Sequence, residues 1–514
     1  MKRTSILRGI GVALMLTLAG FGAQSVSAEE LRIAVASEPP TMDTVVTTQI
    51  QAGEPMRNVF ETLLTLDSDN NVRAMLADTF EQSADGLTIT FTLRKDVPFH
   101  DGTTMTANDV VASMRRWSEF SSAGQTHTPG ATWEAKDENT VVLTLSAPNG
   151  LVLIDLAYNS ANLPGIMPAR IAEAAGKEEI TEYVGTGPFV LEAWNRGQNL
   201  VLKKFENYAA RSEPADGTAG DRTPHYDTIT YHYVADASTI LLGIESGEYD
   251  VAKDFSFDDV SRLKSSGINI GVAPRTGLLN LYFNKAEGLF ADVRARQAVN
   301  IGIDRMNVLL GSYVSEDYFD ITSDFMGAAL DAQWDSSIGR EGFGVPDVEK
   351  AKALLAEAGY NGEKIRILTS VSDGAAYRAA LVVQEELTKL GVDAVLDVYD
   401  SATKSQRRSD KTAWELVLIT NQTKVEPTQL TFFRSSFPGW TSDPKVTELL
   451  AGLMAAPSLD EAKTHYDGLQ QWFVDYLPVI KLGDVSEVYA YRPEVTGIDA
   501  LDPALIVWSA RPAQ

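Results

Sequence analysis

The residues best suited to chemistry lie at positions 99–110, where the sequence reads FHDGTTMTANDV. A histidine beside an aspartate, here His100 and Asp101, could act as a general acid and base or bind a metal ion. Thr106 and Asp109, by contrast, stand three residues apart at the start of a predicted helix, which is the spacing of a capping box. A catalytic role and a structural role therefore compete for this stretch.

The histidines do not form a recognisable metal-binding pattern. No two of them stand four residues apart and the chain has no H-E-x-x-H motif, which excludes a zinc hydrolase of that kind. The five histidines are His100, His127, His225, His232 and His465. Isolated histidines are more often surface residues or hydrogen-bonded structural residues. We therefore expect no metal site and no cofactor.

Patterns of serine enzymes are present but in the wrong order. Ser401–Lys404 and Ser261–Lys264 match S-x-x-K, and Ser68–Asn70 matches S-D-N. In penicillin-recognising enzymes S-x-x-K precedes S-D-N and a K-T-G strand follows, whereas here S-D-N comes first and Lys411–Ala413 lacks the glycine. The chain also has no G-x-S-x-G and no P-loop, and Gly185-Thr-Gly187 is followed by proline. We predict no catalytic residues, so the chain is not expected to be an enzyme.

The first half of the chain predicts strands paired as hairpins together with a few helices, an α+β pattern. Residues 31–36 have the composition of a buried strand, and a helix is expected from about Gln49 to Glu61. The segment 211–227, rich in Asp, Gly, Thr and Pro, is expected to be a polar surface loop. Alternating apolar and polar residues predict further strands at 63–66, 87–93, 140–146, 189–194 and 200–205.

The second half alternates strands and helices. Asp347 is the predicted cap of a helix that ends at Gly359. After it the sequence predicts a strand at 365–368, a helix at 375–390, a strand at 392–398, a short helix near Thr403 and a strand at 414–419. This alternation indicates an α/β unit. Two lobes of different architecture are therefore expected, and a cleft between lobes is the default place for a ligand.

Composition and charge restrict the possible partners. With 514 residues, 44% of them hydrophobic, the chain is long enough for two or three domains with sizeable cores. A net charge of −26 repels nucleic acid and anionic lipid, so we expect no nucleic-acid partner. The absence of cysteine excludes disulfides and thiolate metal sites.

Residues 1–28 have the pattern of a cleavable secretory signal peptide. A basic start is followed by an apolar stretch at 10–21 and by Val26-Ser27-Ala28, which fits a small-x-small cleavage site. The apolar stretch is short for a membrane span and contains glycines, which disfavours a retained anchor. Cleavage would remove three positive charges and no negative ones, taking the net charge from −26 to −29. With no cysteine for a lipid anchor, we expect an unanchored protein of the Gram-negative periplasm.

Several stretches together resemble the extracytoplasmic solute-binding proteins of peptide/nickel-type ABC importers, solute-binding family 5. The resemblance begins with SEPPTMD at 37–43 and FHDGTTMTANDV at 99–110 and covers nearly all of the chain after residue 28. Further stretches that match in order and spacing are Gly185–Phe189, Gly247–Val251, Asn280–Asn284, Asp292–Ala298, Ile303–Arg305 and Gly439–Pro444. Because His100 and Asp101 lie in a corner that the family shares whatever the solute, the resemblance implies a structural role for them.

The resemblance implies an α/β fold of the two-lobed periplasmic binding protein kind, type II-like and in the large three-subdomain form, with mixed sheets and a cleft between the lobes. Lobe I is expected to comprise residues 29–276, including a hairpin-rich subdomain, and residues 482–514, and lobe II residues 277–481. Two crossing segments would form a hinge, and the lobes would close around a solute without a chemical step. The implied partners are a small peptide-like solute and an inner-membrane ABC permease with its ATPase subunits, and the implied state is a monomer.

Position within the family pattern implies a set of ligand-binding residues in the cleft. They are Glu38, Thr41, Lys253, Asp254, Asn280, Tyr282, Gln422, Thr423 and Trp440. Plain packing between the lobes is an equal alternative for Tyr282 and Trp440. A surface ion pair is an equal alternative for Lys253 and Asp254. If Lys253 faces the cleft, we expect a solute that carries a carboxylate or another anion.

The resemblance implies that peptide-binding members of the family hold the ligand α-amine with an aspartate. Thr423 occupies the position of that aspartate in this sequence. A desolvated ammonium without a carboxylate partner costs several kcal/mol, which disfavours an ordinary peptide anchored there, unless Glu426 or Asp400 serves instead. The sequence therefore predicts capture of a peptide or peptide-like solute, with an opine, an oligosaccharide or a nickel chelate as alternatives. An exported hydrolase and a sensor subunit that presents its closed form to a chemoreceptor are the alternatives of other classes.

Overall fold

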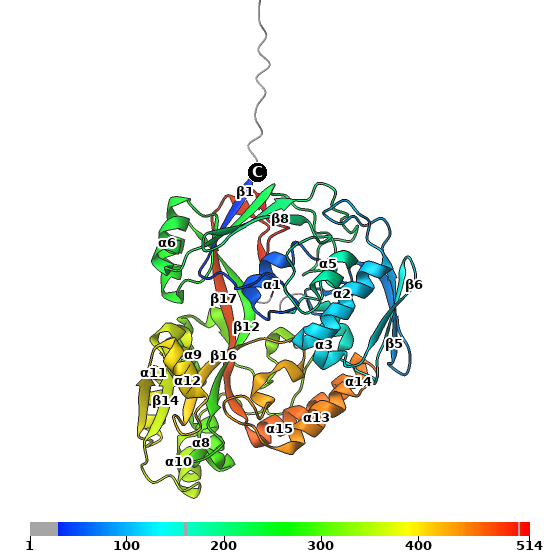
Figure 1. The fold of residues 1–514 in the computed structure, drawn as a ribbon. Helices are drawn as coiled ribbons and strands as arrows, with labels where there is room; N and C mark the ends of the chain where they lie inside the picture. Colours follow the sequence, from blue (N-terminus) through cyan, green and yellow to red (C-terminus); the bar gives the residue numbers. More distant parts are fainter. Residues whose placement is uncertain (1–28, 159–161, 331, 502–503, 514) are drawn as a thin grey trace, which may run out of the picture.

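The structure, a computed structural model, describes residues 29–158, 162–330, 332–501 and 504–513. The predicted signal peptide, residues 1–28, lies outside the described residues. The chain folds into an upper part and a lower-left part, which two long strands connect (Figure 1). Within the described ranges no helix has both the length and the apolar character needed to cross a membrane.

One 11-stranded mixed sheet runs through both parts. Its order is β15-β14-β16-β12-β17-β11-β1-β10-β9-β8, and β13 pairs with β17 outside this path. From one edge to the other the strands are β15 (Ala394–Val398), β14 (Ile365–Thr369), β16 (Leu416–Gln422), β12 (Asn269–Phe283), β17 (Val479–Tyr491), β11 (Val251–Ala252), β1 (Glu30–Val35), β10 (Thr228–Tyr233), β9 (Asn199–Lys204) and β8 (Phe189–Asn195), with β13 at Phe319–Asp320. Parallel pairs such as β14 with β15 and antiparallel pairs such as β8 with β9 both occur, which confirms a mixed α/β architecture.

The strands β12 and β17 join the two parts. Residues 269–273 of β12 pair with the last residues of β17, beside β11, whereas residues 277–282 pair with its first residues and lie beside β16. Between these two sections the register shifts, and Arg275 adopts a positive φ of 56°. Regular pairing is therefore interrupted where the chain passes from one part to the other.

Helices cover the sheet of the lower part, as the alternating pattern predicts. Asp347 caps the helix that follows it, because its carboxylate accepts a hydrogen bond of 3.0 Å from the backbone N–H of Lys350. The strand expected at 414–419 begins at Leu416 instead, and Trp414 is buried with its ring N–H donating to the carbonyl of Arg408. The helices are α8 (Val293–Gly302), α9 (Arg305–Tyr313), α10 (Val348–Glu357), α11 (Ala375–Lys389) and α12 (Ser401–Arg408).

A four-stranded antiparallel sheet forms a separate layer at the right of the upper part (Figure 1). Its order is β4 (Ala77–Gln82), β5 (Thr88–Leu93), β7 (Thr140–Thr144) and β6 (Thr132–Asp137), so the predicted hairpins are confirmed. The helix α2 (Ala107–Phe120) lies against β6, and Trp117 and Trp133 are both buried. The upper part also contains α1 (Ile50–Met56), β2 (Leu64–Leu66), β3 (Val72–Ala74), α3 (Ser122–His127), α4 (Val152–Ala157), α5 (Ala169–Ala175), α6 (Ala237–Ser246), α7 (Val260–Ser265), β18 (Val495–Thr496), β19 (Asp499–Leu501), β20 (Ala504–Ile506) and β21 (Arg511–Pro512).

The corner at residues 99–110 is structural. The Asp109 carboxylate accepts hydrogen bonds from the backbone N–H and the hydroxyl of Thr106, at 2.9 and 2.7 Å, so the predicted cap of α2 is confirmed. His100 accepts a hydrogen bond from the Gly185 N–H at Nδ1 (3.2 Å) and donates from Nε2 to the Gly187 carbonyl (2.9 Å). Burial lowers the pKa of His100 to about 4, so its ring is neutral at physiological pH. Both ring nitrogens therefore serve to fasten this corner to the segment at 185–187.

Two local predictions are wrong. The helix expected at 49–61 ends at Met56, because the Asn58 side chain donates to the carbonyls of Glu54 and Pro55, which a further helical turn would need as acceptors. The segment 211–227 is not simply a surface loop. Thr218 and Arg222 are buried in it, and the Arg222 guanidinium lies 4.7 Å from the centre of the Trp508 ring.

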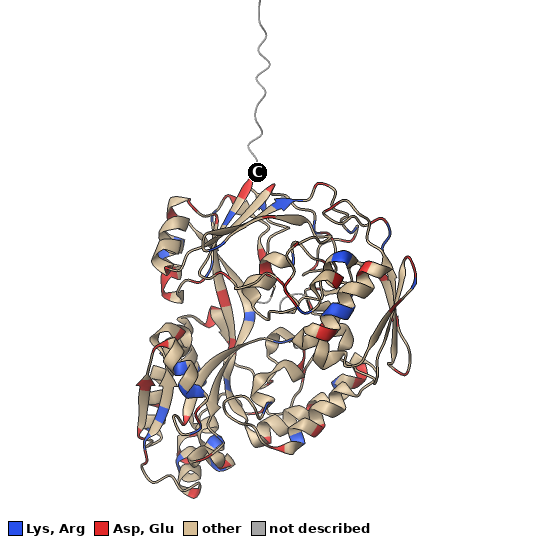
Figure 2. Ribbon diagram, viewed as in Figure 1, with Lys and Arg blue, Asp and Glu red and all other residues tan. Residues whose placement is uncertain are grey.

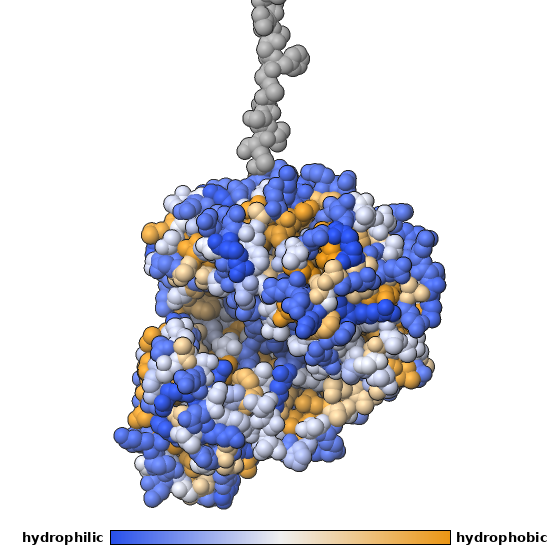
Figure 3. Space-filling model, viewed as in Figure 1, coloured by the Kyte–Doolittle hydropathy of each residue, from blue (hydrophilic) through white to orange (hydrophobic). Residues whose placement is uncertain are grey.

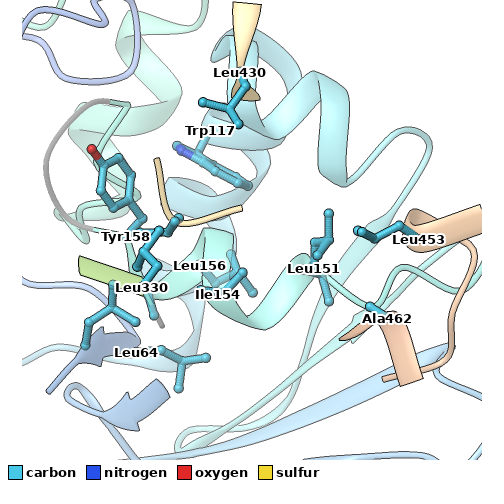
Figure 4. Close-up of a cluster of buried hydrophobic side chains, with 14 of the residues drawn as sticks. Leu64, Trp117, Leu151, Ile154, Leu156, Tyr158, Leu330, Leu430, Leu453 and Ala462 are labelled. Atoms are coloured by element: carbon cyan, nitrogen blue, oxygen red, sulfur yellow. The ribbon is translucent and has the colours of Figure 1, made fainter. Parts of the chain in front are cut away.

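The helices α13 (Pro444–Met454), α14 (Leu459–Thr464) and α15 (Tyr466–Tyr476) follow the lower sheet in the chain but lie beneath the upper part in Figure 1. Figure 4 shows Leu453 and Ala462 near Leu151, all three of them buried. At the same place the Gly150 N–H donates to the Met454 carbonyl at 3.1 Å. The two parts therefore share one continuous hydrophobic core on this side, which includes Leu64, Trp117, Ile154, Leu156, Tyr158, Leu330 and Leu430.

Gly185 provides a test of the tight approach between residues 185–187 and the segment that follows α1. A Cβ at this position would lie 2.0 Å from the Val59 carbonyl oxygen, a backbone atom that cannot move aside. Gly185→Ala is therefore expected to lower the free energy of unfolding in urea by about 2–3 kcal/mol. Gly452→Ala in α13, where a Cβ meets only the His465 ring at 3.9 Å, is the control and should be neutral or stabilising by up to about 1 kcal/mol. Equal effects of the two substitutions would contradict the account.

Candidate functional site

A cavity of about 110 Å³ lies where the two parts meet beside the crossing strands. Figure 3 shows the molecule hollowed between the region of α6 and the region of α9, α11 and α12. Gln422 lines the cavity from the lower part, and most of the other lining residues come from the upper part. The lining residues are Val35, Ser37, Ile50, Gln51, Glu54, Pro55, Tyr231, Tyr233, Lys253, Asp254, Gln422 and Glu487. Three of the nine predicted residues, Lys253, Asp254 and Gln422, thus lie in one site.

Lys253 lines the cavity, but its ammonium is engaged by the protein. Its Nζ lies 2.6 Å from Glu54 Oε2, and that oxygen also accepts a hydrogen bond of 3.2 Å from the Leu505 N–H. Burial alone would lower the pKa of Lys253, but the carboxylates of Glu54 and Glu487 raise it above its usual value. The expectation that Lys253 calls for an anionic solute therefore loses its basis, because a carboxylate of the protein already neutralises this ammonium.

Asp254 and Gln422 lie at the two sides of the same cavity. Asp254 has a positive φ of 62°, an uncommon backbone conformation that aspartate tolerates. Its carboxylate accepts a hydrogen bond of 2.8 Å from the Ala36 N–H at the end of β1. Gln422 ends β16, where it pairs with Gly277 of β12, and its side chain is exposed. Lys253 and Asp254 therefore do not form the ion pair with each other that the sequence allowed. Lys253 pairs with Glu54, and Asp254 accepts from the Ala36 N–H.

Six polar residues of the cavity are absent from the predicted set: Ser37, Gln51, Glu54, Tyr231, Tyr233 and Glu487. Tyr231 and Tyr233 alternate on β10, so the period of a strand could have placed them on one face. Glu54 lies on the buried side of α1, and a charged residue there is a recognisable signal. Glu487 faces the cavity from the crossing strand β17, and the pairing of β17 with β12 is a long-range feature that no local pattern encodes.

Glu38 and Thr41 lie close to this region in the chain but serve the structure. The Glu38 carboxylate accepts a hydrogen bond of 2.8 Å from the Gly197 N–H and lies 3.0 Å from Arg196 Nε, so it holds the turn between β8 and β9. Thr41 is buried, and its hydroxyl accepts a hydrogen bond of 3.1 Å from the Asp43 N–H. Neither is among the residues that line the cavity.

Thr423 lies beside a second cavity of about 300 Å³ and contacts the interrupted section of β12. Its hydroxyl donates to the Arg275 carbonyl at 2.8 Å, and its N–H donates to the Thr276 carbonyl at 2.9 Å. The two substitutes considered for the amine-binding aspartate lie elsewhere. Asp400 caps α12 by accepting from the Thr403 N–H at 2.9 Å, and Glu426 is fully buried next to His127.

Asn280, Tyr282 and Trp440 are packing residues in this conformation. Asn280 and Tyr282 are buried, and both donate to the Asn421 side-chain oxygen, at 2.9 and 2.8 Å. The Trp440 ring stacks on Trp414 with the ring centres 5.6 Å apart. None of the three residues lines either cavity. Their contacts in this conformation are those of packing residues, as the alternative for Tyr282 and Trp440 predicted.

Comparison with known proteins gives the family of this chain. A family model described as bacterial extracellular solute-binding proteins, family 5 Middle, matches residues 71–443. The chain belongs to this family. It is therefore a solute-binding protein of an extracytoplasmic family, and the resemblance seen in the sequence is confirmed.

Individual relatives agree with this assignment. The solute-binding protein is 31% identical over 461 residues, 86% of each chain, to the probable peptide ABC transporter periplasmic-binding protein y4tO of Sinorhizobium fredii. It is 27% identical over 405 residues, 77% of this chain and 73% of the other, to the glutathione-binding protein GsiB of Escherichia coli K12. The solved structure of the ABC transporter substrate-binding protein CtaP from Listeria monocytogenes superposes with a TM-score of 0.82 at 20% identity, covering 95% of this chain and 100% of that chain. The two-lobed binding-protein fold is thus confirmed.

His127, predicted to be an isolated histidine, lies between two carboxylates. Its Nδ1 is 2.9 Å from Asp155 Oδ2 and its Nε2 is 3.8 Å from Glu426 Oε1, and all three side chains are buried. A metal ion would contact only one ring nitrogen, whereas here each nitrogen faces a different carboxylate, which is the arrangement of a protonated imidazolium. Burial opposes the charge on His127, but Asp155 and then Glu426 raise its pKa to about 9. This solute-binding protein therefore carries a charged cluster between α3, α4 and the segment after β16.

The His127 cluster predicts that stability depends on pH. The folded protein holds the His127 proton more tightly than the unfolded chain, so this stabilisation is complete below about pH 6.5 and is lost as the pH rises through about 9. Burial and the nearby Asp155 also raise the pKa of Glu426 to about 7. A raised carboxyl pKa likewise makes the free energy of unfolding fall as the pH rises. The free energy of unfolding lost on His127→Gln should be about 3 kcal/mol at pH 6 and should shrink towards pH 9.5. A loss that does not change with pH would contradict this assignment.

Proposed function

We propose that this protein is the solute-binding component of an ABC importer and that it captures a peptide or peptide-like solute between its two lobes for delivery to the membrane permease. The observation that carries the proposal is the cavity at the crossing strands, which is lined from the lower part by Gln422 and from the upper part by Glu54, Lys253 and Asp254. Similarity to relatives named as peptide and glutathione binders supports the choice of solute class.

In this proposal lobe I comprises residues 29–276 with 482–514, and lobe II comprises residues 277–481. The interrupted pairing at 274–276 between two regular sections of β12 and β17 supports a hinge there. Phe257 lies 5.2 Å from Tyr313 and 5.1 Å from Tyr318, ring centre to ring centre, and these aromatic contacts join the two lobes beside the cleft. A solute held by both lobes favours the closed state and so shifts an open–closed equilibrium.

Lys253, Asp254 and Gln422 are the predicted residues that we assign to direct solute contact, because they line the cavity. In this proposal Thr423 does not contact the solute. Its hydrogen bonds to the carbonyls of Arg275 and Thr276 hold β12 in place where it crosses between the lobes. Glu38, Thr41, Asn280, Tyr282 and Trp440 support the lobes around the cleft. No residue is assigned a catalytic role.

The proposal places the protein in the periplasm, as a monomer, after removal of residues 1–28. It would act there with an inner-membrane permease and its ATPase subunits. Mass spectrometry of the protein from a periplasmic fraction should give a chain that begins at Glu29, and its native mass should be that of one copy. A chain that retains Met1 and remains in the membrane fraction would contradict this part of the proposal.

A thermal-shift screen of the purified protein tests the solute class. A solute at 100 times its dissociation constant adds about 2.7 kcal/mol to the free energy of unfolding, which raises the melting temperature measurably. We expect short peptides to raise it. Opines, oligosaccharides and nickel chelates form the other arms, and a rise with one of these but with no peptide would replace the peptide assignment. Turnover of peptide or ester substrates in the same samples would reveal a hydrolase and overturn the carrier role.

A further inference from the structure

The charges around the cavity do not balance. Glu54, Asp254 and Glu487 each contribute a carboxylate, and Lys253 is the one cation among the lining residues that the structure describes. Because Lys253 forms its ion pair with Glu54, the carboxylates of Asp254 and Glu487 remain without a matching positive charge in the lining. Part of the β17 ribbon is red in the middle of the molecule, the colour of Asp and Glu residues (Figure 2), and Glu487 belongs to that strand.

Unsatisfied polar atoms accompany this excess of negative charge. Glu54 Oε1 and the Tyr231 hydroxyl are buried and make no hydrogen bond within the described part of the chain. The residues Glu54 and Tyr231 are only 4% and 3% exposed, and both line the cavity. A buried polar atom without a partner costs about 1–3 kcal/mol, so these atoms point to a hydrogen-bonding ligand that is added from outside.

A cation of the opposite lobe, Arg378, is engaged by contacts of its own. Arg378 of α11 donates from Nη2 to the Ser312 carbonyl at 2.6 Å, and its Nη1 lies 3.7 Å from the carboxylate of Asp258. Burial raises the pKa of Glu487, and the carboxylates of Asp254 and Glu54 raise it further, against the opposing effect of Lys253. A further positive charge beside Glu487 would therefore stabilise its ionised carboxylate against the repulsion of Asp254 and Glu54.

We propose that this cavity is a subsite for a cationic group of the solute, an ammonium or a guanidinium, held by Glu487 and Asp254 with Glu54 Oε1 as a further acceptor. The inference rests on the proposed function, because it assumes that the cavity is where the solute binds. Its volume of about 110 Å³ suits one end group and not a whole peptide, so the rest of the solute extends into the cleft. Gln422 closes the subsite from the lower lobe and needs no charge for that role.

Isothermal titration calorimetry with matched probes tests the subsite. The probes are trialanine, its C-terminal amide, N-acetyl-trialanine, N-acetyl-Ala-Lys-Ala and 1,4-diaminobutane, which has no peptide bond. The two free-amine peptides should bind alike, and acetylation of trialanine should weaken binding about 30-fold or more, because a buried carboxylate loses its partner. Binding of N-acetyl-Ala-Lys-Ala with an affinity near that of trialanine would also support the subsite and would assign the cation to a side chain.

The variant Glu487→Gln keeps the shape of the side chain and removes its charge. It should weaken trialanine about 30-fold and leave the weak binding of N-acetyl-trialanine unchanged. Glu81→Gln on β4 makes the same change of net charge in the four-stranded sheet and should leave every affinity unchanged. The melting temperatures of both variants should stay close to that of the parent, which separates a binding effect from a folding effect.

The possible failures are distinguishable. If trialanine and N-acetyl-trialanine bind equally well, and Glu487→Gln changes neither, the cationic subsite is wrong while peptide capture stands. If no peptide binds but 1,4-diaminobutane binds and loses affinity in Glu487→Gln, the subsite stands and the peptide assignment is wrong. Absence of binding by every probe, with a heat signal from anionic or uncharged solutes instead, would overturn both.

Discussion

Arg116→Met is expected to lower the free energy of unfolding by about 3–5 kcal/mol, measured by urea denaturation. The Arg116 guanidinium forms a bidentate pair with Asp43, at 2.6 and 3.1 Å, and the two side chains are only 2% and 1% exposed. Arg116 also donates to the carbonyls of Gly176 and Glu178, each at 2.8 Å. Removal of the guanidinium leaves a buried carboxylate without its countercharge, which costs far more than the lost contacts alone.

An exposed ion pair supplies the control for Arg116. Lys136 lies 3.1 Å from Glu134, but both side chains are more than half exposed. Lys136→Met should therefore change the free energy of unfolding by less than about 1 kcal/mol. The double variant Asp43→Asn with Arg116→Met should recover part of the loss, because the buried negative charge is then gone as well. A loss for Arg116→Met no larger than that for Lys136→Met would contradict the assigned role.

Lys253→Met is the second substitution for which we expect a large effect, and it acts on stability and on binding. Glu54 is buried and its Oε1 has no hydrogen bond within the described chain, so loss of the Lys253 ammonium leaves an uncompensated carboxylate. We expect the free energy of unfolding to fall by about 3–5 kcal/mol. In the same variant the cavity becomes more negative, so a cationic solute should restore more stability to it than to the parent.

A double-mutant cycle separates these effects. Glu54→Gln combined with Lys253→Met removes both charges of the pair, and its loss of stability should be smaller than that of Lys253→Met alone. The measurement is urea unfolding of the parent, both single variants and the double variant at one pH. Strict additivity of the two single losses would show that Lys253 and Glu54 do not depend on each other, which would contradict the ion pair.

Features set by neighbouring residues could be predicted from the sequence. The caps at Asp347 and Thr106, the β8–β9 hairpin and the alternation of strands and helices after residue 347 are formed by contacts between residues close in the chain. The early end of α1 was missed because Asn58 competes for the helix carbonyls, a side-chain choice that propensity does not reveal. The packing of α13–α15 against the upper part depends on contacts such as Leu151 with Leu453, which are hundreds of residues apart.

The site shows the same division. The resemblance placed Lys253, Asp254 and Gln422 near the cleft, and they line one cavity. Thr423 is adjacent to Gln422 but lies at the other cavity, because successive side chains of an extended chain point to opposite faces. Position alone could not distinguish the two, nor could it show that Lys253 is neutralised by Glu54, which is 199 residues away.

Hydrogen–deuterium exchange of the purified protein, with and without the solute that gives the largest thermal shift, tests most directly whether the solute binds in the cavity at the crossing strands. The account predicts slower exchange in the solute complex at α1, at β10, at residues 251–257 and at 420–422, with no change in the four-stranded sheet β4–β7. Protection confined to residues 68–70, 328–330 and 332, which line the second cavity, or to the four-stranded sheet would contradict it.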